Sequence, residues 1–127
     1  MTYQPYKKAG LLKPVHESKH LFVVMNNVCE NGYCLIIMVT TIKKNKFYDD
    51  SCVLDVGDHD FIKHPSYLHY RLSDTEKSTR ITKLVGINYY IPKDDFADDV
   101  FKRIANGLFK SKQTRRRILS YAEAVLA

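Results

Sequence analysis

Hydrophobic residues in the first half of the chain fall in short runs that predict β-strands. Residues 21–25 (LFVVM) form a compact apolar run, and residues 33–42 (YCLIIMVTTI) form a longer, β-branched run. The middle of the second run is apolar at consecutive positions, so we expect it to be buried on both faces. Asn31 and Gly32, just before it, are typical of a tight turn. These two runs therefore predict a β-hairpin.

Three further runs with β character follow a charged loop at residues 43–50. Residues 51–56 (SCVLDV) predict a short strand that is ended by a glycine. Residues 67–72 alternate between apolar and polar side chains, which is the period of a half-buried strand. Residues 78–85 (STRITKLV) alternate less cleanly. The sequence therefore predicts five strands in all.

The hydrophobic period then changes to that of a helix and predicts two helices within residues 94–127. The apolar face of the first comprises Phe96, Val100, Phe101, Ile104 and Leu108. The apolar face of the second comprises Ile118, Leu119, Ala122, Val125 and Leu126. Thr114 is a suitable N-cap for this second helix.

Strands followed by helices, rather than alternating with them, predict an α+β fold. We expect a small, strongly bent antiparallel sheet of five to six strands, or a small β-barrel, with two C-terminal helices packed on it. The expected core comprises Phe22, Val24, Leu35, Ile37, Val53, Leu68, Tyr70, Phe101, Ile104, Ile118 and Leu119.

The length of the chain and its first residues indicate how many domains to expect and whether a signal peptide is present. A length of 127 residues suits a single domain spanning residues 1–127. Residues 1–19 carry four lysines against one glutamate and predict an extended basic arm rather than a signal peptide. The longest apolar run, residues 34–39, is far too short to span a bilayer. We therefore expect a soluble, cytoplasmic protein with no membrane partner.

The chain is basic, because 20 Lys and Arg residues stand against 14 Asp and Glu residues, giving a formal net charge of +6. Such an excess favours anionic partners, with nucleic acid first and acidic protein surfaces second. The three cysteines lack the Cys-x-x-Cys spacing of a metal site. An odd number of cysteines in this pattern is typical of reduced thiols in the cytoplasm.

The densest positive run is the segment KSKQTRRR at residues 110–117. Its cations are Lys110, Lys112, Arg115, Arg116 and Arg117. The three arginines fall in the first turn of the second predicted helix, where the helix dipole disfavours positive charge. An anionic partner would offset this cost, so the run is a candidate nucleic-acid contact. The alternative is a solvated loop between two helices.

The five histidines have two chemical interpretations. His59, His64 and His69 are five residues apart, with two aspartates nearby, and three such groups can bind zinc or manganese. Positions five apart on an extended strand point to opposite faces, so convergence would require a turn at Pro65. Polar loop residues that satisfy backbone groups are the favoured explanation, and we expect no metal site.

The second interpretation is acid–base chemistry on RNA. Cleavage by the RNA's own 2′-hydroxyl needs a base, an acid and positive charge on the phosphate, but no metal ion, cofactor or protein nucleophile. Imidazoles exchange protons near neutral pH, and hydroxyl side chains orient a phosphate. We expect the catalytic residues to be His16, His20, Thr41 and His69. The groove that holds them should also contain Lys19, Thr40 and Arg71 as phosphate contacts.

Several short motifs spread over residues 16–108 resemble those of one family, the PemK/MazF-like toxins of toxin–antitoxin modules. The matching segments are His16-Glu17 before the first apolar run, Thr40-Thr41 at the end of the next, Ser66-Tyr67-Leu68 leading to Arg71, and Arg80-Ile81 leading to Gly86. Lys19 and His20 stand where the family has an Arg-Pro step. The second C-terminal helix is an addition to the family pattern.

The resemblance implies an SH3-like barrel and, as activity, sequence-specific cleavage of RNA. It also implies a symmetric homodimer and an antitoxin or another protein as partner. The preferred function is therefore RNA binding with metal-independent cleavage. Because a fold alone does not determine an activity, the residues of the site must decide.

The alternative belongs to a different class of protein. It is a non-catalytic module of a phage or mobile element that binds a protein or nucleic-acid partner through its basic surface. Convergence of His16, Thr41 and His69 on one phosphate position would favour the enzyme. Dispersal of these three groups beside a broad basic or apolar patch would favour the binding module.

Overall fold

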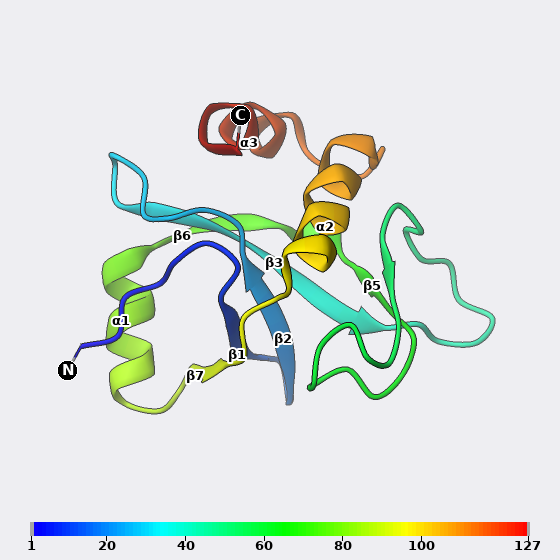
Figure 1. Ribbon diagram of the computed structural model, residues 1–127, viewed down its shortest axis with the longest axis horizontal. Coiled ribbons are helices and arrows are strands. Elements are labelled where there is room, and N and C mark those ends of the chain that lie inside the picture. Colours follow the sequence, from blue (N-terminus) through cyan, green and yellow to red (C-terminus); the bar gives the residue numbers. More distant parts are fainter. Residues whose placement is uncertain (1, 127) are drawn as a thin grey trace.

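The computed structural model describes residues 2–126, and in that range it has one antiparallel seven-stranded sheet and three α-helices (Figure 1). The strands are β1 (Gly10–Val15), β2 (Ser18–Val24), β3 (Tyr33–Thr41), β4 (Val53–Leu54), β5 (Ser66–Leu68), β6 (Asp74–Lys77) and β7 (Ile91–Lys93). The helices are α1 (Ser78–Gly86), α2 (Asp98–Lys110) and α3 (Arg116–Leu126), with a short 3₁₀ helix η1 (Tyr70–Leu72). Met1 and Ala127, the ends of the predicted domain, lie outside the described residues.

Strand β3 is the centre of the sheet, whose order is β4-β5-β3-β2-β1-β7, with β6 also paired to β3. One edge of β3 pairs with β2, where Phe22 lies opposite Met38. The other edge is shared between two strands. Its C-terminal half pairs with β5, where Thr40 lies opposite Tyr67, and its N-terminal half pairs with β6. The chain makes one turn as η1 between these two strands and returns to the same edge of β3.

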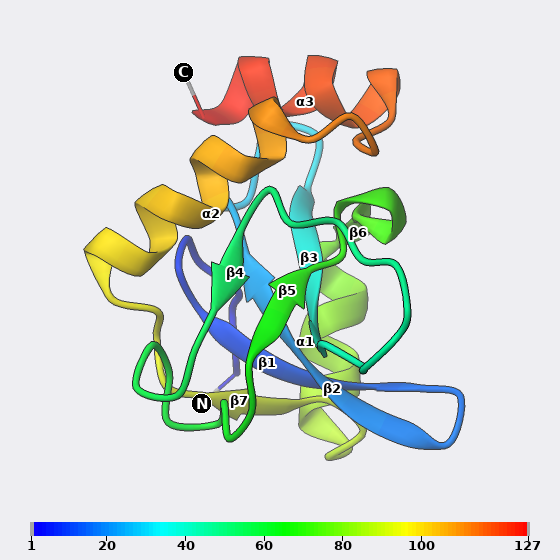
Figure 2. The same cartoon turned by 90° about the vertical axis from the view of Figure 1, so that its right-hand side faces the viewer.

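Alternating side chains of β2 and β3 divide the core into two layers. One face carries Leu21, Val23, Leu35, Ile37 and Val39, which pack against α2 and α3. The other face carries Phe22, Val24, Cys34, Ile36 and Met38, which pack against α1 and Tyr90. Figure 1 and Figure 2 show α2 and α3 together on one side of the sheet and α1 on the other. Because both faces of β3 are covered, its side chains are apolar at consecutive positions rather than at alternate ones.

The predicted α+β class, the hairpin and the two C-terminal helices are confirmed. The hairpin is β2–β3, and Gly32 in its turn has a φ of 85°, a conformation that glycine adopts readily. Most of the expected core is buried, but Val53 is 37% exposed and Leu119 is half-buried. Within residues 2–126 the end strands β4 and β7 do not pair with each other, so the sheet is not closed into a barrel.

Residues 78–85 form helix α1, so the strand predicted there is wrong. The strand next to it in the chain is β6, which pairs with β3 and ends at Lys77, directly before α1. The apolar residues of this segment have helical spacing and face the α1-side core: Ile81, Leu84 and Val85. The strands predicted at residues 51–56 and 67–72 are shorter than expected, because pairing covers only β4 and β5.

The predicted arm at residues 1–19 is not a free arm over its second half. Gly10–Val15 is strand β1, which lies between β2 and β7, and Leu11 and Leu12 are buried. The pairing with β7 ends at Leu12, so Pro14 lies past it, at a position where proline is tolerated. In the part of the chain that the structure describes, no helix is long and apolar enough to cross a membrane.

Candidate nucleic-acid interface

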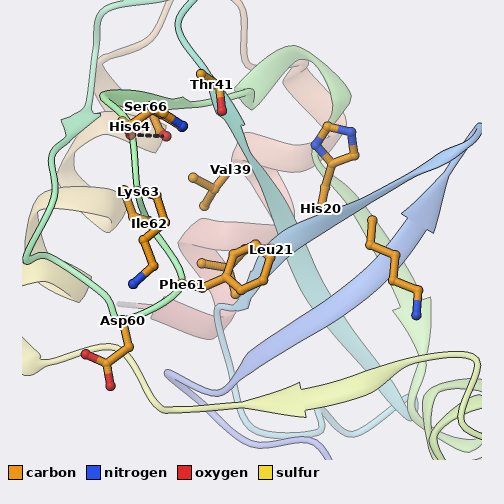
Figure 3. Close-up of a pocket in the computed structure, with 11 residues that line it drawn as sticks. His20, Leu21, Val39, Thr41, Asp60, Phe61, Ile62, Lys63, His64 and Ser66 are labelled. Atoms are coloured by element: carbon orange, nitrogen blue, oxygen red, sulfur yellow. Dashed lines mark hydrogen bonds between the residues drawn. The ribbon is translucent and has the colours of Figure 1, made fainter.

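A hollow of about 450 Å³ lies at the C-terminal end of β3, between β2 and the loop of residues 60–66 (Figure 3). Its floor is apolar and includes Leu21, Val39 and Ile62, all buried. Its polar lining comprises Lys19, His20, Thr41, Asp60, Lys63, His64 and Ser66. We call this site the histidine hollow. It combines two imidazoles, two hydroxyls and two ammonium groups with one carboxylate.

The two central strands bring His20 and Thr41 into this hollow. The pairing of β2 with β3 runs from Val24 to Phe22, and Phe22 lies opposite Met38. His20 and Thr41 lie just beyond that last pair, near the start of β2 and at the end of β3. Figure 3 shows both side chains at the same end of the hollow. Two of the residues predicted to be catalytic therefore line one cavity.

His59 holds the loop that forms the opposite wall. Its Nδ1 accepts a hydrogen bond from the N–H of Phe61 at 3.0 Å, so Nε2 carries the proton and donates to the carbonyl of Asp94 at 2.7 Å. The centroids of the His59 and Phe96 rings are 4.6 Å apart, and His59 is 6% exposed. This histidine orders the backbone and is not available as a metal ligand or a proton donor to a substrate.

His64 lies beyond this anchor, close to the end of β3. The N–H of Ile42 donates to the carbonyl of Pro65 at 2.9 Å, and the hydroxyl of Ser66 donates to the carbonyl of His64 at 2.8 Å. These bonds tie the backbone of the loop to β3 and to itself. The His64 side chain is exposed, so its imidazole is accessible to a ligand in the hollow.

Three further hollows are linked to the first through shared lining residues. The tyrosine hollow, of about 210 Å³, shares Thr41 with the histidine hollow and is also lined by Thr40, Lys43, Lys46, Phe47, Tyr48, Tyr67 and His69. A smaller hollow shares Tyr67 and His69 with it and adds Arg71 and Gln113. The last shares Gln113 and adds Lys110 and Lys112. We call the four together the basic band, since seven lysine and arginine side chains and three aspartates line it.

The structure places most of the predicted site residues along this band. The histidine hollow takes Lys19, His20 and Thr41, and the tyrosine hollow takes Thr40, Thr41 and His69. Arg71, Lys110 and Lys112 follow in the next two hollows. Four predicted residues line none of these four hollows: His16, Arg115, Arg116 and Arg117. His16 lies in the β1–β2 turn with a φ of 56° and is exposed. Thr41 and His69 therefore share a hollow that His16 does not reach.

Two of the three arginines at the start of α3 bind groups within the chain. This weakens the expectation that the helix dipole calls for an external anion there. The guanidinium of Arg115 donates to the carbonyl of Ser73, and that of Arg117 lies 2.7 Å from the carboxylate of Asp74. Partial burial alone would raise the pKa of Asp74, but the hydrogen bonds from Arg117 and from the N–H of Thr75, together with the charges of Arg117 and Arg115, outweigh it and lower that pKa. Arg117 therefore has a carboxylate partner within the chain, and the Arg115 guanidinium is hydrogen-bonded to the backbone, so neither needs an external anion as a hydrogen-bond partner.

His69 differs from the other predicted imidazoles in its surroundings. Burial, together with the positive charge of Arg71, lowers the pKa of His69 below its ordinary value. The ring is therefore neutral at neutral pH and can accept a proton or stack, but it is a poor proton donor. In Tyr67, beside it, burial raises the pKa of the phenol, so this ring is also uncharged.

Sequence reasoning missed part of this site. It indicated His64 only as a metal ligand and Tyr67 only as part of a family motif, and it gave Lys63 and Tyr48 no role. These residues belong to loops, or to a strand of three residues, and carry no periodic signal. Their position depends on how the loop folds against β3. Within residues 2–126 no three His, Cys, Asp or Glu side chains are grouped closely enough to hold a metal ion.

The geometry thus offers a basic surface with an imidazole-lined hollow at one end and aromatic rings at its centre. Such a surface can bind a polyanion and present its bases to aromatic side chains. No family model matches the chain, and the comparison with curated proteins finds no relative.

Proposed function

We propose that this chain binds RNA along the basic band. The observation that carries the proposal is the continuity of the four hollows, which share lining residues and carry seven cations against three carboxylates. A strand that follows such a surface can place several successive phosphates near lysine and arginine side chains. Hydroxyl groups of Thr40 and Thr41 add hydrogen-bonding partners in the histidine and tyrosine hollows.

Metal-independent cleavage of the bound RNA is the activity we propose for the histidine hollow. Its support is the presence of two imidazoles, His20 and His64, in one cavity together with Lys19 and Lys63. One imidazole, acting as base, takes the proton of a 2′-hydroxyl, and the 2′-oxygen then attacks the adjacent phosphorus. The other, as imidazolium, gives a proton to the leaving 5′-oxygen, which leaves a 2′,3′-cyclic phosphate and a 5′-hydroxyl. Of the catalytic residues expected from the sequence, His16, His20, Thr41 and His69, this proposal keeps only His20 as a proton-transfer group.

The role we propose is that of a PemK/MazF-like toxin with an SH3-like arrangement of strands, and it rests on the sequence motifs described above. A homodimer and an antitoxin partner belong to the same proposal. The second candidate is a non-catalytic module of a phage or mobile element. The position of His16, away from Thr41 and His69, favours this candidate, because the expected catalytic set is not assembled.

The test separates binding from cleavage. The purified protein is titrated with an end-labelled, unstructured RNA at several salt concentrations, and mixed RNAs are then incubated with it in EDTA. We expect binding whose affinity falls with salt at a log–log slope of about −0.7 for each phosphate contact. Discrete fragments that end in a cyclic phosphate and persist in EDTA support the enzyme.

Each other outcome has a definite meaning. Binding without fragments at high protein concentration supports the non-catalytic module and contradicts cleavage. Fragments that disappear in EDTA contradict a metal-independent reaction. If no RNA binds even at about 50 mM salt, where such contacts are strong, the proposed function is wrong.

A further inference from the structure

We propose that the rings of Tyr48, Tyr67 and His69 form a stacking site for an unpaired base of a single RNA strand. We call these three residues the aromatic triad. The inference rests on the proposed function, because it places one base of the bound RNA at a defined point of the basic band. It adds that the protein recognises base faces there and selects single strands over duplexes.

The three rings form a continuous row. The centroids of Tyr48 and Tyr67 are 5.4 Å apart with an interplanar angle of 38°, and those of Tyr67 and His69 are 5.5 Å apart with an angle of 39°. Tyr67 belongs to β5 and His69 directly follows this strand, at the start of η1. All three line the tyrosine hollow and are half-buried. The row therefore presents ring surface to whatever enters that hollow.

Packing of the core does not explain this row. In the described part of the chain, the two hydrophobic clusters that surround the sheet contain none of the triad residues. Next to the triad, Phe47 is 86% exposed and lines the same hollow. Aromatic rings gathered at a surface, outside both cores, are the usual platform on which proteins stack the bases of single strands.

The loop that carries Tyr48 is anchored on the adjacent residue. The carboxylate of Asp49 accepts hydrogen bonds from the N–H and hydroxyl of Ser51, at 3.0 and 2.6 Å, and from the hydroxyl of Ser111. Partial burial would raise the pKa of Asp49, but the bonds from Ser111 and Ser51 outweigh it and lower that pKa. The anchor is therefore ionised at neutral pH, and Tyr48 is held beside Tyr67 before any ligand binds.

The charges around the triad fit a strand better than an isolated apolar group. Lys43 and Lys46 line the tyrosine hollow, and Arg71 lines the adjoining hollow, which all three triad residues line too. A base stacked on the rings would thus have cations available for the phosphates before and after it. In a duplex both faces of a base are already stacked on its neighbours, so this arrangement selects an unpaired base.

The experiment compares matched RNA strands that differ at one position. A short unstructured RNA carries 2-aminopurine at its centre, a second carries an abasic site there, and a third is annealed to its complement. We expect the 2-aminopurine fluorescence to fall on binding, and the abasic strand and the duplex to bind at least about tenfold more weakly.

Variants then assign the effect to the rings. Tyr48→Leu and Tyr67→Leu should each weaken binding of the intact strand about tenfold, with an unchanged salt slope, and should bring it to the level of the abasic strand. Tyr48→Phe should retain stacking. Lys43→Gln is the matched control, because it should lower the salt slope by about 0.7 and leave the preference for the base intact. Thermal unfolding of each variant shows whether the fold is kept. If Tyr67→Leu unfolds, Tyr48→Leu still tests the inference, because Tyr48 lies in a loop.

The inference is wrong if the wild-type protein binds the intact and abasic strands equally, or if the duplex binds as well as the single strand. It is also wrong if free adenosine monophosphate binds as tightly as the strand, since the site would then serve a nucleotide. These results leave RNA binding itself in place. Absence of RNA binding in the same titration would overturn the proposed function as well.

Discussion

The Nε2–H of His59 donates a hydrogen bond to the carbonyl oxygen of Asp94 at 2.7 Å, and Gly10 of β1 lies directly against this pair. This hydrogen bond links the loop that forms one side of the histidine hollow to the segment that precedes α2. It therefore connects the shape of the candidate site to the packing of the N-terminal strand. A side chain at position 10 would disturb both at once.

We expect Gly10→Ala to destabilise the fold and to distort the histidine hollow. The added Cβ would collide with the carbonyl oxygen of Asp94 and would lie 3.2 Å from Nε2 of His59. Forced contacts of this kind cost about 1–3 kcal/mol of the free energy of unfolding, which urea titration measures. The matched control is Gly86→Ala at the end of α1, where a Cβ meets no atom within 4 Å. It should be neutral or stabilising by up to about 1 kcal/mol, and an equal loss in both variants would contradict the prediction.

The two halves of the basic run at residues 110–117 should behave differently on substitution. Lys110 and Lys112 are exposed and line the basic band, whereas Arg115 and Arg117 bind Ser73 and Asp74. Changing both lysines to Gln should lower the salt slope of RNA binding by about 0.7 for each contact, with stability unchanged.

Changing Arg115 and Arg117 to Gln should do the opposite. We expect the free energy of unfolding to fall, because the contacts between α3 and the start of β6 are lost, and we expect the salt slope to stay near that of the wild-type protein. Relief of unfavourable charge at the helix start would instead predict a more stable variant. A stabilised double variant would thus show that the helix dipole outweighs these contacts.

The ion pair of Asp74 gives a pH dependence with a definite sign. Because the pKa of Asp74 is lower in the folded chain than in the unfolded chain, its contribution is complete above the unfolded value of about 4 and is lost as the pH falls through the folded pKa. The stability difference between the wild-type protein and Asp74→Asn should therefore be largest at neutral pH and vanish in acid. Since Asp74 is exposed, about 1 M salt should shrink the difference. A difference independent of pH would contradict this account.

The parts of the fold that the sequence predicted are those set by local pattern. The β2–β3 hairpin follows from two apolar runs and Gly32, and α2 follows from its apolar stripe. Strand β6 could not be predicted, because its buried side chain is a carboxylate. Glu76 lies in the sheet because the Tyr90 hydroxyl donates to it at 2.7 Å and Lys13 lies 3.1 Å away. Partners so distant along the chain leave no periodic signal in residues 74–77.

In the candidate site, too, the sequence predicted the residues that lie in or next to regular strands and missed those placed by loops. His20 and Thr41 were predicted together: His20 directly precedes the strand predicted at residues 21–25, and Thr41 lies near the end of the next one. Pairing of β2 with β3 places both in the lining of one hollow. His64 was missed because its position depends on the loop held by His59. His16 was assigned to the site because its imidazole can exchange protons near neutral pH and because His16-Glu17 resembles a family motif. In the structure His16 lies instead in the tight turn between β1 and β2, because Val15 pairs with Ser18 and only two residues separate them.

The assignment of the two imidazoles in the histidine hollow leads to the most direct test of catalysis. If His20 and His64 exchange protons with the RNA, His20→Gln and His64→Gln should each reduce the cleavage rate in EDTA by about 100-fold or more, because each removes one proton-transfer step. Neither should weaken RNA binding by more than a few-fold, since the cations of the band remain. His16→Gln is the matched control, because it removes an exposed histidine of the adjacent turn that lines none of the four hollows. Equal rates in all three variants, or a loss confined to His16→Gln, would show that the histidine hollow does not perform the reaction.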